Sequence, residues 1–273
     1  MRIMNLATTD FSVIIECFLK AFANYYVPMP TDHNYYKKRW AIAGVRYDLS
    51  YGVFENDKLI AFMLHAVDER EGVQIAFNTG TGVLPNYRGQ HLVQKLYAIA
   101  LKDFKNIGVK KIKLEVIQEN SKAIRAYQKV GFTIQKELLC YKGFLKPISS
   151  DKIVVKAVDI KNVDWQEIPN QLEYSWDFQK ETLINSSYRF YYLLEENIYM
   201  GYFIIDVDNK MIAQFDLLVD DENQWQYLFA AMASFGKEFR LINLSAARID
   251  KKNQLEIYGW ENTINQYEML YEF

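Results

Sequence analysis

A strand, a short loop and a long helix follow one another between residues 73 and 104. Residues 73–82 have the composition of a strand, which leads through residues 84–88 into a helix expected to begin at about Gln90. Gly108 is expected to end this helix. Its apolar residues fall at i, i+3, i+4, i+7, i+8 and i+11: Val93, Leu96, Tyr97, Ala100, Leu101 and Phe104. The order of these elements requires a domain that mixes strands and helices.

The rest of the first half fits the same class. Residues 11–23 have helical spacing, and two strand-like segments, 51–55 and 59–66, flank a turn at Asn56-Asp57. A further strand is predicted by the alternation of Ile112, Leu114 and Val116, after which Asn120 can cap a helix that ends before Gly131. We therefore predict a mixed α/β fold with a central, mostly antiparallel sheet flanked by helices.

The loop before the long helix is a candidate anion site. The first turn of a helix has unpaired N–H groups and the positive end of the helix dipole. Gly89 would let the backbone approach an anion closely, and Arg88 adds positive charge. The loop is not a P-loop, because no Lys-Ser/Thr follows the glycine, and its glycine spacing does not fit a dinucleotide-binding loop.

Length and composition limit the possible classes of protein. The 273 residues suffice for two domains, and with 50% hydrophobic and 15% aromatic residues the chain should be globular. It has two cysteines, no CxxC and no Cys/His cluster, so neither a disulfide scaffold nor a metal site is expected. Residues 1–20 lack the apolar core of a signal peptide, and no window is apolar enough for a membrane span. We expect a cytoplasmic protein without a membrane or nucleic-acid partner.

Charge divides the chain into two halves. Residues 1–146 hold 21 Lys and Arg against 13 Asp and Glu, whereas residues 147–273 hold 11 against 21. This division describes either two unrelated solvated surfaces or a first half that binds an anion and a second half that does not. The Pro/Ser stretch at residues 146–151 suggests the boundary. We predict domains at 1–148 and 149–273, and the oligomeric state stays open.

Two motifs together suggest a family. The first is the Val83-x-Pro85-x-x-Arg88-Gly89 loop, and the second is the run Asn120, Ala123, Tyr127, Gly131 and Phe132. Together they resemble the GNAT superfamily of acyl-CoA-dependent N-acetyltransferases over roughly residues 1–146. One position departs from the family, whose loop usually reads Arg-Gly-x-Gly/Ala, because His91 occupies the last slot. We interpret His91 as a partly exposed residue that contributes only its backbone N–H.

The resemblance implies an acetyl-CoA site and no metal. Asn120 would contact the pantetheine arm, although it is equally natural as a helix N-cap. A bulged strand end, comprising Thr81, Gly82 and Val83, would pair with the pantetheine and place an amide near the thioester oxygen. The backbone amides that would hold the pyrophosphate belong to Arg88, Gly89, Gln90, His91, Leu92 and Val93.

The same resemblance suggests two catalytic residues. Tyr127 would lie near the sulfur and protonate the leaving thiolate, although by its spacing alone it would be an aromatic core residue. An amine acceptor also needs a base, because its ammonium form cannot attack. Glu115 is the candidate, since its distance from Tyr127 resembles that in N-terminal-amine acetyltransferases of the superfamily. Glu115 also shares a strand face with Lys111 and Lys113, which describes a salt-bridged surface equally well, and a water chain could serve instead.

The second half echoes the first. Residues 191–206 repeat the strand, Glu-Asn turn and strand of residues 51–66, and residues 259–271 echo residues 131–141. Asp220, Asp221 and Glu222 stand where the anion loop should be, and they would repel a pyrophosphate. We predict a tandem GNAT-like protein whose degenerate second copy does not bind CoA.

The predicted function is the direct transfer of an acetyl group from acetyl-CoA to a primary amine. A non-catalytic acyl-CoA sensor or scaffold is the alternative. The acceptor stays open among peptide N-termini, lysine, polyamines and aminoglycosides, and so does the choice between acetyl and a longer acyl group. The aromatic residues 24–36 lie where the superfamily often builds its acceptor pocket.

Overall fold

The chain divides into two compact units in the computed structural model, which describes residues 1–147 and 153–273. The first unit consists of Met1–Gln135 together with Tyr267–Phe273, and the second of Lys136–Gln266. The expected boundary between residues 148 and 149 lies outside the described residues. The compact units separate between residues 135 and 136, and the last strand of the chain belongs to the first unit.

The first unit contains four α-helices within its described residues. The strands are β1 (Arg2–Asn5), β2 (Tyr51–Glu55), β3 (Lys58–Arg70), β4 (Val73–Val83), β5 (Lys111–Ile117), the start of β6 (Thr133–Phe144) and β13 (Gln266–Glu272). The helices are α1 (Phe11–Ala21), α2 (His33–Ala43), α3 (Leu92–Asn106) and α4 (Ser121–Gln128), with short 3₁₀ turns at Tyr47–Leu49 and Pro85–Tyr87.

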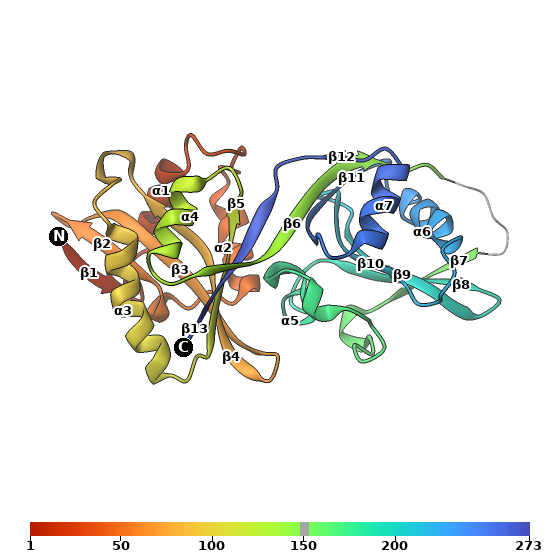
Figure 1. Ribbon diagram of the computed structural model, residues 1–273, viewed down its shortest axis with the longest axis horizontal. Helices are drawn as coiled ribbons and strands as arrows, with labels where there is room; N and C mark the ends of the chain where they lie inside the picture. The colour runs from red at the N-terminus through yellow and green to blue at the C-terminus, as the bar shows by residue number, and fades with distance from the viewer. Residues whose placement is uncertain (148–152) are drawn as a thin grey trace. The chain divides into compact units, whose positions relative to one another are not determined.

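The sheet of this unit is mostly antiparallel. Strands β1 to β4 pair in sequence order and antiparallel, whereas β5 runs parallel to β4 and has β13 on its other side (Figure 1). The turn between β2 and β3 has Asn56 and Asp57 at φ of 47° and 61°. Two left-handed residues in succession are typical of a type I′ hairpin, as the sequence predicted.

Helices cover both faces of the sheet. On one face α1 packs against β4 so closely that a Cβ on Gly82 would lie 2.9 Å from that of Ala21. Aromatic contacts of Phe18 with Tyr36 and Trp40 place α2 on the same face. On the other face Tyr97 of α3 meets Tyr127 of α4. We call these the α1 face and the α3 face.

The second unit repeats this plan. Its sheet has the order β6-β11-β10-β9-β8-β7, in which β10 and β11 form the parallel pair. The strands are β7 (Ile153–Val158), β8 (Arg189–Glu195), β9 (Ile198–Asp206), β10 (Met211–Leu217), β11 (Glu238–Ser245) and β12 (Glu261–Asn262). The helices are α5 (Lys180–Leu183), α6 (Gln224–Ala233) and α7 (Ile249–Ile257), and 3₁₀ turns occur at Ile160–Asn162, Gln171–Glu173 and Trp176–Phe178.

Two features identify the second unit as a repeat of the first. The β8–β9 hairpin turns at Glu196 and Asn197, which have φ of 48° and 67°, like the β2–β3 hairpin. The register of β10 against β9 shifts at Ala213, just as that of β4 against β3 shifts at Thr79. The predicted fold class, with two mixed α/β units of mostly antiparallel sheet, is thereby confirmed. None of the described helices is both long and apolar enough to cross a membrane.

Candidate active site

Strands β4 and β5 separate part-way along their length. They pair in parallel only where Ile75–Asn78 lies beside Lys111–Leu114. At that point β4 contains a bulge, because Leu64 pairs with Gly80 and His65 with Asn78, which leaves Thr79 as the extra residue. The bulge therefore lies just before Thr81–Val83, the residues at which the resemblance implied a bulged strand end. We call the space between the unpaired ends of β4 and β5 the split.

The end of β4 turns backbone groups toward the split. Leu84 N–H donates to the carbonyl of Ile60 in β3, at 2.9 Å. Backbone groups alternate in direction along a strand, so those of Thr81 and Val83 point away from β3, to the side where β5 has departed. The Gly82 backbone points to β3 instead, and its missing side chain lets α1 pack closely. Of the three predicted residues, Thr81 and Val83 can therefore pair with a ligand in the split, Val83 through its N–H group, since its carbonyl accepts from Arg88.

A buried polar network lies on the α3 face of the split. The Asn78 Nδ2 donates to the Thr81 hydroxyl and to the Tyr97 hydroxyl, each at 2.7 Å. The Thr81 side chain is also hydrogen-bonded to Tyr127. These four side chains connect β4 with α3 and α4, and the Tyr127 hydroxyl is thereby held at the end of β4.

Tyr127 lies among aromatic rings. Its ring makes edge contacts with Tyr97 and Phe132 at centroid distances of 6.4 and 5.8 Å. Burial raises the pKa of Tyr127 to about 12, although the hydrogen bond with Thr81 acts in the opposite direction. The hydroxyl is therefore protonated at neutral pH and can donate a proton or a hydrogen bond. Tyr127 is a core residue by its packing, and its hydroxyl points to the split.

Glu115 lies on the α1 face. Leu114 pairs with Asn78, whose side chain points to α3, so Leu114 is on the α3 face. Side chains alternate along a strand, which places Glu115 on the opposite side. Lys111 and Lys113 share that face, but both bind Glu71. Tyr127 and Glu115 thus approach the split from opposite faces of the sheet, and a ligand between the strands would lie between them.

The loop before α3 leaves several amides without an acceptor. Gly89 and His91 both have left-handed backbones, with φ of 81° and 58°, and α3 begins at Leu92 rather than at about Gln90 as predicted. The helix starts later because the left-handed His91 is its N-cap residue. From Gly89 to Gln94 the backbone N–H groups bond to no acceptor in the described part of the chain, and His91 is exposed. This helix start is suited to an anion.

Arg88 does not extend toward that anion position. Its Nε donates to the Val83 carbonyl at 3.2 Å, and its NH2 nitrogen donates to the Ala21 carbonyl at 2.9 Å. Its own amide is hydrogen-bonded to the Pro85 carbonyl. We expected Arg88 to supply positive charge and a backbone amide to the phosphate. In the structure its guanidinium instead connects β4 to the end of α1.

The turn between β5 and α4 is tied to the loop that follows α1. Asn120 caps α4, since its Oδ1 accepts from the Ala123 amide at 3.2 Å. Its side chain is also hydrogen-bonded to Tyr25, and the Tyr26 hydroxyl donates to the Glu119 carbonyl at 3.2 Å. The aromatic segment predicted to shape an acceptor pocket is thus anchored at the same end of β5 as the split.

Two members of the network were not predicted from the sequence. Asn78 and Tyr97 hold Thr81, and through it Tyr127, in place. Tyr97 was recognised only as one of the apolar positions of its helix. Asparagine is depleted in strands, so an asparagine inside the predicted strand 73–82 was the available signal.

The cysteines take no part in this arrangement. Cys17 and Cys140 are both buried and free, and burial raises the pKa of Cys17 to about 12. Cys17 is therefore a thiol at neutral pH and a poor nucleophile. Within the described residues, no three His, Cys, Asp or Glu side chains are grouped so that they could hold a metal ion.

In the second unit the equivalent region is filled by its own side chains. β10 pairs with β11 only at Met211 and Ile212. Beyond these two residues, polar side chains of β10 lie where the split would be in the first unit. Asp216 binds Arg248 at 2.8 and 3.0 Å and Lys251 at 3.2 Å. The start of α6 is also occupied, because Asp221 Oδ1 accepts from the Asn223 amide at 3.0 Å.

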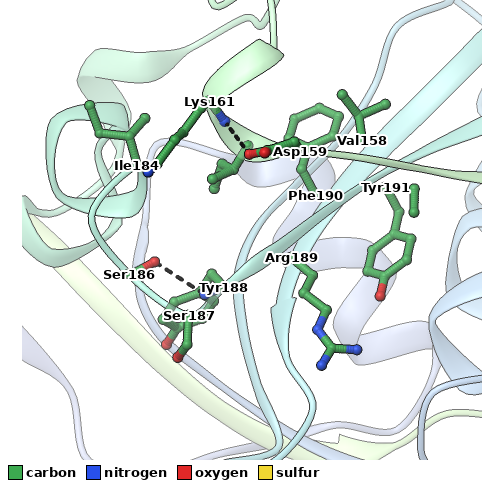
Figure 2. A pocket seen from close by; sticks show the side chains of 12 residues that line it. Val158, Asp159, Lys161, Ile184, Ser186, Ser187, Tyr188, Arg189, Phe190 and Tyr191 are labelled. Atoms are coloured by element: carbon green, nitrogen blue, oxygen red, sulfur yellow. Dashed lines mark hydrogen bonds between the residues drawn. The ribbon is translucent and has the colours of Figure 1, made fainter.

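The second unit also has an open pocket of about 490 Å³ (Figure 2). It is formed by the end of β7, the 3₁₀ turn after it and the segment that leads into β8. Lys161 N–H donates to Asp159 and Tyr188 N–H to Ser186, so the polar groups near it are partly bound among themselves. None of the residues predicted to form the active site lines this pocket.

Comparison with known proteins agrees with the geometry. Residues 14–132 match the Acetyltransferase (GNAT) family. N-alpha-acetyltransferase 30 of Schizosaccharomyces pombe is 26% identical over 110 residues, which are 40% of this chain and 69% of that protein.

Two solved structures resemble the whole chain in fold. A putative acetyltransferase from Pyrococcus horikoshii has 16% identity and a TM-score of 0.68, covering 100% of this chain and 89% of its own. A tandem GNAT protein from the clavulanic acid biosynthesis pathway has 13% identity and a TM-score of 0.65, covering 99% and 98%.

Proposed function

We propose that the first unit transfers an acetyl group from acetyl-CoA to a primary amine. The chain belongs to the GNAT acetyltransferase superfamily and carries its fold in tandem. The observation that carries this proposal is the split, with the Tyr127 hydroxyl on one face, Glu115 on the other and the open helix start of α3 following β4. The relative from Schizosaccharomyces pombe, an N-alpha-acetyltransferase by name, supports acetyl transfer.

The residues have distinct proposed roles in binding acetyl-CoA. The amides from Gly89 to Val93 bind the pyrophosphate, because they lie at the positive end of the α3 dipole and donate to no acceptor among the described residues. The backbone of Thr81 and Val83 pairs with the pantetheine in the split, and Asn120 contacts its arm. Arg88 acts indirectly, by fixing the end of β4 against α1.

The chemistry needs one proton removed and one supplied. Glu115 takes a proton from the ammonium of the acceptor, whose nitrogen lone pair then attacks the thioester carbonyl. A C–N bond forms and the C–S bond breaks. Tyr127 gives its proton to the leaving thiolate and recovers one from the attacking nitrogen, so that the products are the acetylamide, CoA thiol and one released proton. Because both cysteines are buried and Cys17 is a thiol, we propose direct transfer without an acetyl-enzyme.

We further propose that the second unit does not bind acetyl-CoA. Asp221 and its acidic neighbours occupy the start of α6, where a phosphate would have to lie. The region equivalent to the split contains Asp216 and its two cationic partners. Both positions are already used by the protein's own groups.

A screen of acetyl-CoA consumption over amine classes tests the function. Peptides with a free N-terminus, lysine, spermidine and an aminoglycoside would be incubated with the full chain and acetyl-CoA, and the product mass measured. A mass increase of one acetyl group on one class is expected. Tight binding of acetyl-CoA without turnover of any class would indicate a non-catalytic sensor instead.

A further inference from the structure

The register of the last strand follows from one hydrogen bond. Phe273 N–H donates to the Lys110 carbonyl at 3.1 Å, which joins the residue after β13 to the residue before β5. Since β13 lies beside β5, the two strands can overlap only if they run antiparallel. Counting inward from this pair places Glu268 opposite Glu115.

The burial pattern supports this register. It pairs Ile112 with Tyr271, Leu114 with Met269 and Val116 with Tyr267, and all six belong to one hydrophobic core. The alternate residues of both strands must point to the other side of the sheet, the α1 face. Glu115 and Glu268 therefore share that face on neighbouring strands, and the strand of Glu115 borders the split.

Two carboxylates in this position repel each other. Like charges directly opposite in an antiparallel pair are destabilising. Glu268 is only 6% exposed, and its carboxylate has no hydrogen bond or ion pair with any described residue. The lysines nearest along β5, Lys111 and Lys113, bind Glu71. A buried carboxylate is stable when a cation compensates it, and the substrate of the proposed reaction is an ammonium ion.

We propose that Glu268 is an acceptor-binding residue, which holds the ammonium of the substrate beside Glu115. This inference rests on the proposed function and narrows the substrate class. The reacting nitrogen lies beside two carboxylates, so an acceptor with its own carboxylate close to that nitrogen is repelled. Free α-amino acids reacting at their α-nitrogen are therefore disfavoured, whereas peptide N-termini, polyamines and aminoglycosides are compatible.

The test compares Glu268→Gln with Glu272→Gln. Glu272 is four residues further along the same strand, on the same face, and exposed, so it is a matched control. For each variant, the melting temperature, the acetyl-CoA affinity and kcat and KM over the four amines would be measured. Binding of each amine to the CoA complex would be followed by calorimetry, with N-acetylated peptide as the uncharged probe.

For Glu268→Gln we expect an unchanged or higher melting temperature, because a repulsion is removed. Acetyl-CoA affinity should stay within twofold of the wild type. The KM of the preferred amine should rise about 10- to 100-fold, the range of a lost hydrogen bond to a charged group, and amine binding should weaken in parallel. Glu272→Gln and the binding of the N-acetylated peptide should not change.

The other outcomes bear separately on the role of Glu268 and on the proposed function. Wild-type turnover with an unaffected Glu268→Gln variant overturns the role of Glu268 and leaves the proposed function standing. Amine binding that depends on Glu268, without turnover, supports the role of Glu268 and overturns the proposed function. If the wild type neither binds nor acetylates any of the four amines, both are overturned.

Discussion

The hydroxyl of Tyr127 is hydrogen-bonded to Thr81 just beyond the point where β4 parts from β5. The bulge at Thr79 makes this contact possible, because it brings Thr81 onto the same side of β4 as Asn78, and both then face α3. One extra residue in β4 thus places Thr81 on the face of the sheet where Tyr127 lies.

Gly89 and Gly108 offer a matched test of the anion loop. They lie beyond opposite ends of α3, have φ of 81° and 83°, and a Cβ on either would meet no atom within 4 Å. Alanine at either position should cost about 1 kcal/mol of unfolding free energy, because L-residues disfavour this conformation. Only Gly89→Ala should also weaken acetyl-CoA binding, measured by calorimetry. Equal affinities in the two variants would remove the loop from the binding site.

Burial of His65 predicts a loss of stability in acid. Burial lowers the pKa of His65 to about 3. The unfolded chain binds a proton below about pH 6.5, whereas the folded chain does not, so stability falls as the pH drops from there toward 3. The contribution is about 1.4 kcal/mol per pH unit. Urea unfolding at several pH values should show this slope in the wild type and a shallower one in His65→Leu.

The last strand should be essential to the first unit. Met269 is fully buried in its core, and Tyr271 packs on Phe132 at a centroid distance of 5.6 Å. Met269→Ala should therefore cost about 2–5 kcal/mol. Urea unfolding would measure the cost, with the exposed Glu272→Ala as control. A fragment of residues 1–148 lacks this strand and should fold poorly; equal stability with and without it would contradict the assignment of β13 to this unit.

The local elements were predictable from the sequence because short-range patterns determine them. The apolar spacing from Val93 to Phe104 predicted α3, and Asn56-Asp57 predicted the hairpin. Residue 120 was predicted to cap α4 and does. The partner of β13 was not predictable, because it depends on pairing between residues about 150 positions apart, for which local patterns give no signal.

The site was predictable in part, for a related reason. Motif spacing indicated Tyr127, Thr81 and Val83 as candidate site residues, but the direction of the Arg88 side chain depends on where α1 ends. Asn78 and the proposed role of Glu268 were missed because they depend on side chains that only the tertiary fold brings together.

Asp216 should stabilise the second unit without affecting the proposed donor site. It is buried against Arg248 and Lys251, and these hydrogen bonds and charges lower its pKa despite the opposing effect of burial. Asp216→Asn removes the ion-pair partner of the buried Lys251 and one of the two carboxylates bound to Arg248, and it should cost about 3–5 kcal/mol. Asp250→Asn, at a more exposed partner of Arg248, should cost less than about 1 kcal/mol. Both variants should keep wild-type acetyl-CoA affinity at temperatures where they stay folded, as measured by calorimetry; weakened binding would contradict the proposal that the second unit has no CoA role.

Tyr127→Phe removes one hydroxyl and keeps the aromatic packing, so it tests whether that hydroxyl protonates the leaving thiolate. Two quantities would be measured: kcat for acetylation of the amine identified by the screen, and the affinity for acetyl-CoA. We expect kcat to fall by about 100- to 10,000-fold while acetyl-CoA affinity is retained. An unchanged kcat would contradict this expectation and would show that the Tyr127 hydroxyl takes no part in the reaction.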